Sequence, residues 1–218
     1  MKDFALLDEY LSKQDHSVHY SAKKLAKIVR EAYPIGVPAL IMKSSTDRLG
    51  ISAGYSFHLG TPDDLLRRLA SWLITKSNGN HLLLLRLNRL LWKRHGREDV
   101  ALSAIILANL DHVTLETNPW EVLQSSLGRK EPIDGLLLTI EELLRSGRKV
   151  PSEKLILKWV NGRLVDGHLA ILTTYNGMIR GVEPDLEIIK HLEEVNIPPT
   201  DSIIRRIMEK ISAKKPQD

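Results

Sequence analysis

The feature that most constrains the fold of this chain is its regular punctuation by glycine and proline. Segments with apolar residues at helical spacing end at intervals of 32, 34 and 34 residues, near Gly96, Gly128, Gly162 and Asn196. The partner helices start at intervals of 35, 34, 31 and 37 residues, near Asp63, Glu98, Pro132, Arg163 and Thr200. Such a period is typical of stacked helical hairpins, which bury their apolar faces only against their neighbours. It favours a solenoid, and the alternative is a compact all-α bundle with coincidental spacing.

The same residues give the bounds of the expected helices. A Gly-Arg pair follows a helical segment at four places, beginning at Gly96, Gly128, Gly147 and Gly162. We expect each of these glycines to close the last turn of its helix in the left-handed conformation. Prolines fit the first turn of a helix, where the N–H has no partner: Pro62, Pro119, Pro132, Pro151, Pro184 and Pro199. We expect helices at 2–13, 20–33, 36–44, 62–76, 80–95, 98–110, 118–127, 132–146, 151–161, 163–180, 184–195 and 199–213.

Between these helices, residues 45–61 are rich in glycine and serine and are expected to form a long irregular loop, and no segment reads as a strand. We therefore expect an all-α, right-handed superhelix of stacked antiparallel helix pairs. Residues 1–61 would be capping helices and the loop, 62–213 the repeats and 214–218 a frayed tail, together forming one structural domain.

Composition agrees with this fold and excludes several classes of protein. About one residue in six is leucine, while aromatic residues make up only 5% of the 218, which favours helices over sheets. The chain contains no cysteine, which excludes a disulfide scaffold, a thiolate zinc site and a cysteine nucleophile. The N-terminal segment lacks the pattern of a signal peptide, and no apolar run is long enough to span a membrane. We expect a cytoplasmic protein without membrane contacts.

The net charge of +4 hides an uneven distribution of charged residues. Residues 62–97 carry a charge of +6, whereas residues 98–128 contain acids and no base, giving −5. A basic block of this size is able to bind phosphates, although a solvated helix face is the commoner meaning of such a run. In the expected helix 80–95, Arg86, Arg89 and Lys93 stand at i, i+3 and i+7 and form one stripe. Arg67, Arg68 and Arg97 could extend this basic surface.

Other motifs give weaker indications. His16 and His19, beside Asp15, provide two imidazoles and a carboxylate, but no third strong ligand follows at the usual spacing, so we expect no metal site. The glycines of residues 49–60 follow no strand, and no motif of a nucleotide-binding loop, zinc protease or serine hydrolase occurs. No cofactor is expected.

Two small-residue-rich helices, at 99–110 and 166–179, have the apolar density of an inner layer, and here the chain resembles the HEAT-like helical-repeat proteins. Trp120 and Gln124 stand one turn apart, a spacing similar to that of a tryptophan and an aspartate in the alkylpurine DNA glycosylases of this class. That resemblance implies a DNA-binding surface, with Trp159 and Arg163 as matches to a further aromatic and an arginine. The alternative for each tryptophan is core packing.

The chain departs from that family at the catalytic position. Gln124 stands where the family has its carboxylate, and a neutral amide cannot stabilise a developing positive charge as an anion does. The sequence therefore predicts a binding protein rather than an enzyme, one that contacts double-stranded or branched DNA through its basic surface. The alternatives are a protein–protein scaffold and, less favoured, an active DNA glycosylase. The oligomeric state stays open.

Overall fold

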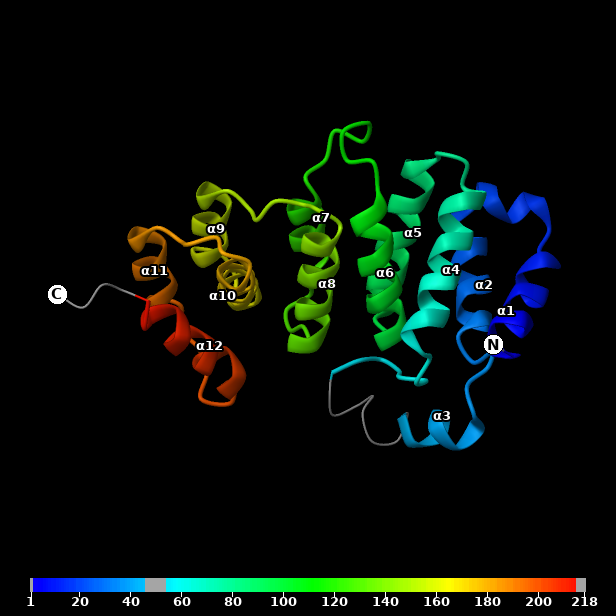
Figure 1. Cartoon of the computed structure of the whole chain (residues 1–218), viewed down its shortest axis with the longest axis horizontal. Coiled ribbons are helices and arrows are strands. Elements are labelled where there is room, and N and C mark those ends of the chain that lie inside the picture. Colours follow the sequence, from blue (N-terminus) through cyan, green and yellow to red (C-terminus); the bar gives the residue numbers. More distant parts are fainter. Residues whose placement is uncertain (1, 46–53, 215–218) are drawn as a thin grey trace. The chain divides into compact units, whose positions relative to one another are not determined.

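The computed structural model describes residues 2–45 and 54–214, and this part of the chain consists of helices and connecting loops without a β-strand (Figure 1). The all-α class is thereby confirmed. The chain divides into two compact units, residues 1–119 and 120–218. The eight residues 46–53, in the first half of the expected long loop, lie outside the described residues, as does most of the expected frayed tail.

The first unit holds six α-helices and one 3-10 helix in its described residues, whose bounds are α1 (Lys2–Ser12), η1 (His16–Tyr20), α2 (Ala22–Ala32), α3 (Ala39–Ser45), α4 (Asp63–Lys76), α5 (His81–Arg94) and α6 (Arg97–Asn109). Its helices α1, α4 and α6 pack in that order, and α5 packs against both α2 and α6. The centre of the unit is α6, which is buried continuously from Glu98 to Ala108. The small residues Ala101, Ser103 and Ala104 allow its neighbours to approach closely.

The second unit is arranged in the same way by its own helices, α7 (Pro119–Ser126), α8 (Ile133–Arg145), α9 (Glu153–Val160), α10 (Leu164–Ile179), α11 (Leu186–Glu193) and α12 (Ser202–Ser212). Here α10 packs against α8 and α12, while α9 packs against both α10 and α11. Like α6, α10 is buried along most of its length, from Val165 to Thr173. Every expected helix is present, and η1 is an addition.

The glycine of each Gly-Arg pair was expected to adopt the left-handed conformation after a helix. This prediction is confirmed at one pair and wrong at the other three. Gly147 follows α8 with φ +84°. Gly96 has φ −73° and caps the start of α6, while His95 takes the left-handed conformation, and neither Gly128 nor Gly162 has a positive φ. At Gly96 space rather than φ excludes a side chain, because a Cβ there would overlap the Phe57 ring.

Prolines mark the helix starts, but mostly from just outside them. Only Pro119 is the first residue of its helix. Pro62 and Pro132 are N-cap residues with ψ of 148° and 131°, and so set an extended entry into α4 and α8.

Candidate nucleic-acid interface

Helix α5 presents a row of bases to solvent. Arg86, Arg89 and Lys93 are all exposed, and no ion pair engages them in the described part of the chain. Their positions follow from the opposite face of the helix, where Leu84, Leu87 and Leu91 have no exposed surface. The Asn80 side chain accepts the Leu83 N–H at 3.0 Å and so caps the helix start. The row therefore consists of three unpaired cations on the exposed face of a capped and packed helix.

The helix beside α5 adds further bases that the sequence interpretation did not include. Helix α2 packs against α5 and exposes Lys23, Lys24 and Lys27. Lys27 Nζ lies 3.9 Å from Glu31 Oε1, a weak exposed pair. The amphipathic pattern of α2 is visible in the sequence, but its position next to α5 is not.

The arginines of α4 differ from those of α5, because both are neutralised. Arg67 Nε lies 2.7 Å from Asp63 Oδ2 in the same helix, and Arg68 makes two hydrogen bonds of 2.8 Å to Asp8 of α1. The Arg68 hydrogen bonds hold the pKa of Asp8 below its ordinary value, although partial burial opposes them. Arg68 therefore faces α1, and Arg67 is paired within its own helix, so neither is an unpaired cation like those of the α5 row.

The other two arginines of the basic block lie at the start of α6 and the end of α5. Arg97, half-buried, is the first residue of α6, and its N–H donates to the Phe57 carbonyl at 2.9 Å. Arg94 turns inward, where its Nε donates to Asp99 Oδ2 at 2.7 Å and its Nη1 to the Ala26 carbonyl at 2.7 Å. Arg94 therefore ties α5 to α2 and α6 rather than facing a ligand.

In the second unit, Trp120, Gln124, Trp159 and Arg163 lie in one region, but the two indoles are interior. Trp120 is 3% exposed and Trp159 is 0% exposed. Their rings meet edge to face with centroids 6.4 Å apart, and Trp120 Nε1 donates to the Lys149 carbonyl at 2.9 Å. This is the core packing that the sequence left open as the alternative. A buried indole offers no face on which a nucleic-acid base can stack.

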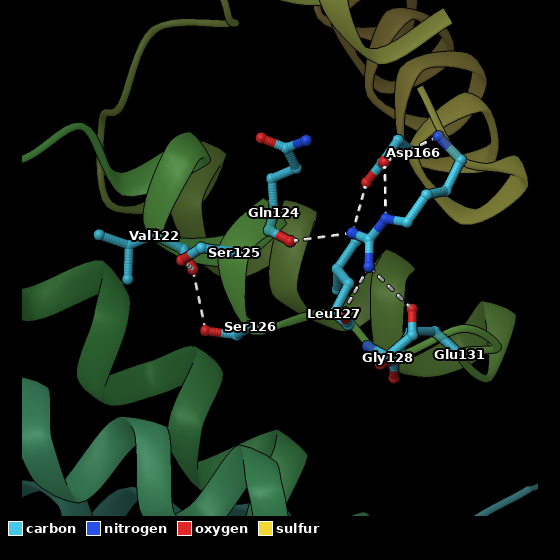
Figure 2. Close-up of polar contacts among 9 residues, drawn as sticks. Val122, Gln124, Ser125, Ser126, Leu127, Gly128, Glu131 and Asp166 are labelled. Atoms are coloured by element: carbon cyan, nitrogen blue, oxygen red, sulfur yellow. Dashed lines mark hydrogen bonds and ion pairs between the residues drawn. The ribbon is translucent and has the colours of Figure 1, made fainter. Parts of the chain in front are cut away.

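Arg163 is the N-cap residue of α10 and forms hydrogen bonds with the end of α7. Figure 2 labels the residues around its side chain, among them Gln124, Leu127, Gly128 and Asp166. Arg163 Nη1 donates to the Leu127 carbonyl at 3.0 Å and its Nη2 to the Gln124 carbonyl at 3.3 Å, which satisfies carbonyls at the C-terminal end of α7. Its Nε and Nη2 also bind both oxygens of Asp166, at 2.9 and 2.8 Å. The guanidinium is thus fully engaged within the unit.

Asp166 is the carboxylate beside Gln124 that the sequence interpretation missed. It is 2% exposed, and its Oδ2 accepts the Arg163 backbone N–H at 3.0 Å. Burial raises the pKa of this carboxyl, but the hydrogen bonds and charge of Arg163, with a further hydrogen bond from Gln124, bring the net pKa below its ordinary value. The only sequence signal was its place three residues into α10, where an acid caps the helix start.

The same arrangement occurs in the first unit. Asp99, like Asp166, is the third residue of the central helix, is almost fully buried and accepts the N–H of its own N-cap residue. It too binds an arginine that reaches a backbone carbonyl of another helix, and Tyr33 Oη donates to it at 2.7 Å. The two aspartates are 67 positions apart, about twice the expected repeat.

The histidine pair is arranged for packing. His19 is buried and its ring centroid lies 4.9 Å from that of Trp72, while Asp15 accepts the Ser17 N–H and caps η1. Among residues 2–45 and 54–214, no three metal-ligating side chains gather. Within the same ranges, no helix has the length and apolarity needed to cross a membrane.

Comparison with known proteins adds no relative. No family model, no curated protein and no solved structure matches this chain.

Proposed function

We propose that the two units are parts of one α-solenoid of HEAT-like helix pairs. Two observations support this, each made within the units. Alternate helices form one row, α1–α4–α6 and α8–α10–α12, and the helices between them form another, α2–α5 and α9–α11. The capped and arginine-bound aspartate recurs two repeat lengths along the chain, at Asp99 and Asp166. Similar neighbours and similar caps are what a stack of related hairpins requires.

We further propose that the protein binds double-stranded or branched DNA without acting on it. The observation that carries this proposal is the row of unpaired cations on α5, Arg86, Arg89 and Lys93. Bases at this helical spacing extend over two turns, and arginine binds phosphate oxygens through two parallel N–H groups. Such contacts are independent of sequence and dependent on salt.

The absence of catalysis is part of the proposal and rests on the second unit. Trp120 and Trp159 are buried, Arg163 is engaged by carbonyls and by Asp166, and Gln124 carries no charge. A catalytic group must reach the substrate. Both indoles are interior, and the Arg163 guanidinium, although partly exposed, is occupied by Asp166 and by the carbonyls of Gln124 and Leu127. We expect no release of bases from alkylated DNA, and release that depends on Trp120 would instead support the glycosylase alternative.

The test is the affinity for duplex and branched DNA over a range of salt concentrations, measured by fluorescence anisotropy. Replacing Arg86, Arg89 and Lys93 with alanine should weaken binding at least about tenfold and lower the salt slope by about 2 to 3. The matched control replaces three exposed bases of the second unit, Arg205, Arg206 and Lys214. It removes the same charge and should change binding much less.

Equal binding by the α5 variant and the wild type would refute the nucleic-acid proposal. Capture of a stoichiometric protein partner that survives nuclease treatment would then favour the scaffold alternative, in which the adjacent +6 and −5 segments suit a partner of mixed charge.

A further inference from the structure

A cavity of about 230 Å³ lies in the second unit, between α9, α10 and α11. Its walls are mainly aliphatic, with Val150, Ile156, Val182 and Ile188 around the space. Gly177 of α10 keeps one wall open, since a Cβ there would come within 3.1 Å of Val150 Cγ1. An apolar cavity of about 150 Å³ already admits benzene, so this one has room for an aromatic ring with a short side chain.

One polar group inside this lining has no partner. Thr173 lines the cavity from α10 and has 0% exposed surface, yet its hydroxyl makes no hydrogen bond within the described residues. A threonine in a helix commonly donates to the carbonyl four residues earlier, as Thr139 does to Gly135 at 2.9 Å. A buried hydroxyl without a partner is costly, so this one is suited to a ligand that supplies a hydrogen bond.

Three of the other lining residues are acidic. Glu153, Glu183 and Asp185 border the cavity, are exposed, and form no ion pair in the described part of the chain. Asp185 caps α11 by accepting the Glu187 N–H at 3.0 Å, which fixes its carboxylate in place. Three carboxylates at the solvent side of an apolar cavity attract a cation and repel an anion.

We propose that this cavity binds a small molecule with a hydroxyl at one end, an apolar ring or branched chain in the middle and an ammonium group at the other end. The hydroxyl meets Thr173 in the buried part, the apolar body lies against Ile156, Val182 and Ile188, and the ammonium group lies among the three carboxylates. The site is separate from the α5 row and does not depend on the proposed binding of DNA.

The proposal is tested by calorimetric titration of the full chain with three related probes. Tyramine has the hydroxyl and the ammonium group, phenethylamine lacks the hydroxyl, and 3-(4-hydroxyphenyl)propionate exchanges the ammonium group for a carboxylate. We expect tyramine to bind one to one with a dissociation constant of about 0.1–1 mM. Phenethylamine should bind about 3- to 10-fold more weakly and the propionate at least about 10-fold more weakly.

Two variants locate the site. Thr173→Val keeps the side-chain shape and should reduce tyramine affinity to that of phenethylamine, without changing the affinity for phenethylamine. Val182→Trp, at a position that is 45% exposed, should fill the cavity and abolish binding of both amines, whereas the control Val113→Trp in the first unit, at an 86% exposed position, should not.

The proposal fails if tyramine does not bind at millimolar concentration, or if the propionate binds as well as tyramine. It also fails if the preference for tyramine over phenethylamine survives in Thr173→Val.

Discussion

At the scale of single residues, buried charges are tied to backbone positions that only the fold brings near. Glu98 has no exposed surface, and its Oε1 accepts the N–H groups of Leu59 and Gly60 at 2.8 Å each. The sequence shows Glu98 as one acid in a −5 segment and gives no sign of this contact. Such pairings cannot be predicted from local pattern, because their partners are 38 and 39 residues away.

The loss of stability of the second unit at acidic pH should come in part from Asp166. Because its pKa is lowered from 3.8 in the folded protein, Asp166 stabilises the fold above that pH, and the stabilisation is lost as the pH falls through the folded value. Asp166→Asn should cost about 1–3 kcal/mol at neutral pH, since it leaves Arg163 without its carboxylate. Chemical denaturation from pH 7 to pH 2 should show a smaller loss of unfolding free energy below pH 4 in the variant than in the wild type.

The control for that experiment is Glu121→Gln, which breaks an ion pair between exposed side chains of the same unit. Lys158 Nζ lies 3.7 Å from Glu121 Oε1, and both side chains are more than half exposed. This substitution should cost less than about 1 kcal/mol. A pH profile of Asp166→Asn parallel to that of the wild type would contradict the assigned role of Asp166.

At the scale of secondary-structure elements, the helices were largely predictable and their ends were not. Apolar spacing placed every helix, because α6, α10 and their neighbours have long periodic segments. The ends of helices depend on contacts instead. Gly96 looked like a helix-closing glycine, yet it starts α6 and lies against Phe57, a residue from the loop that precedes α4. Helical periodicity carries no information about that loop.

The close approach of Gly96 to this loop makes a substitution there costly. Phe57 cannot easily move away, because the Arg30 guanidinium carbon lies 3.6 Å from its ring centroid. Gly96→Ala should therefore lower the free energy of unfolding by about 1–3 kcal/mol, as overpacking does. Urea denaturation measures the change, and Phe57→Ala in the same chain should recover part of it.

The comparison is Gly147→Ala after α8. Gly147 has φ +84°, and no atom lies within 4 Å of the place that the alanine methyl group would take, so only the backbone conformation opposes the change. A cost of about 1 kcal/mol is expected there. Phe57→Ala should restore part of the free energy of unfolding lost in Gly96→Ala but none of that lost in Gly147→Ala. If it restored stability in both variants, the Phe57 ring would not be the cause of the loss in Gly96→Ala.

At the scale of the whole molecule, the net charge of +4 is less informative than how the fold distributes it. In the sequence, residues 62–97 read as one basic block, but the structure divides it. Arg86, Arg89 and Lys93 stay exposed and unpaired, Arg67 and Arg68 are matched by acids, and Arg94 is drawn into the first unit. Linear counts cannot show this, because the neutralising Asp8 lies 60 residues from Arg68.

The lysines of α2 provide the last prediction, because α2 packs beside α5. If both helices contact the same phosphate backbone, each removed base should lower the salt slope of DNA binding by about 1. Replacing Lys23 and Lys27 with alanine should therefore lower the slope by about 2 in the wild type, and by a further 2 or so in the α5 triple variant. Additive effects are expected because these exposed side chains share no partner.

The same anisotropy titrations measure both slopes. An unchanged slope in the α2 variant would restrict the interface to α5, while a loss of slope equal to that of the control at Arg205, Arg206 and Lys214 would mean that binding follows total charge and not this surface.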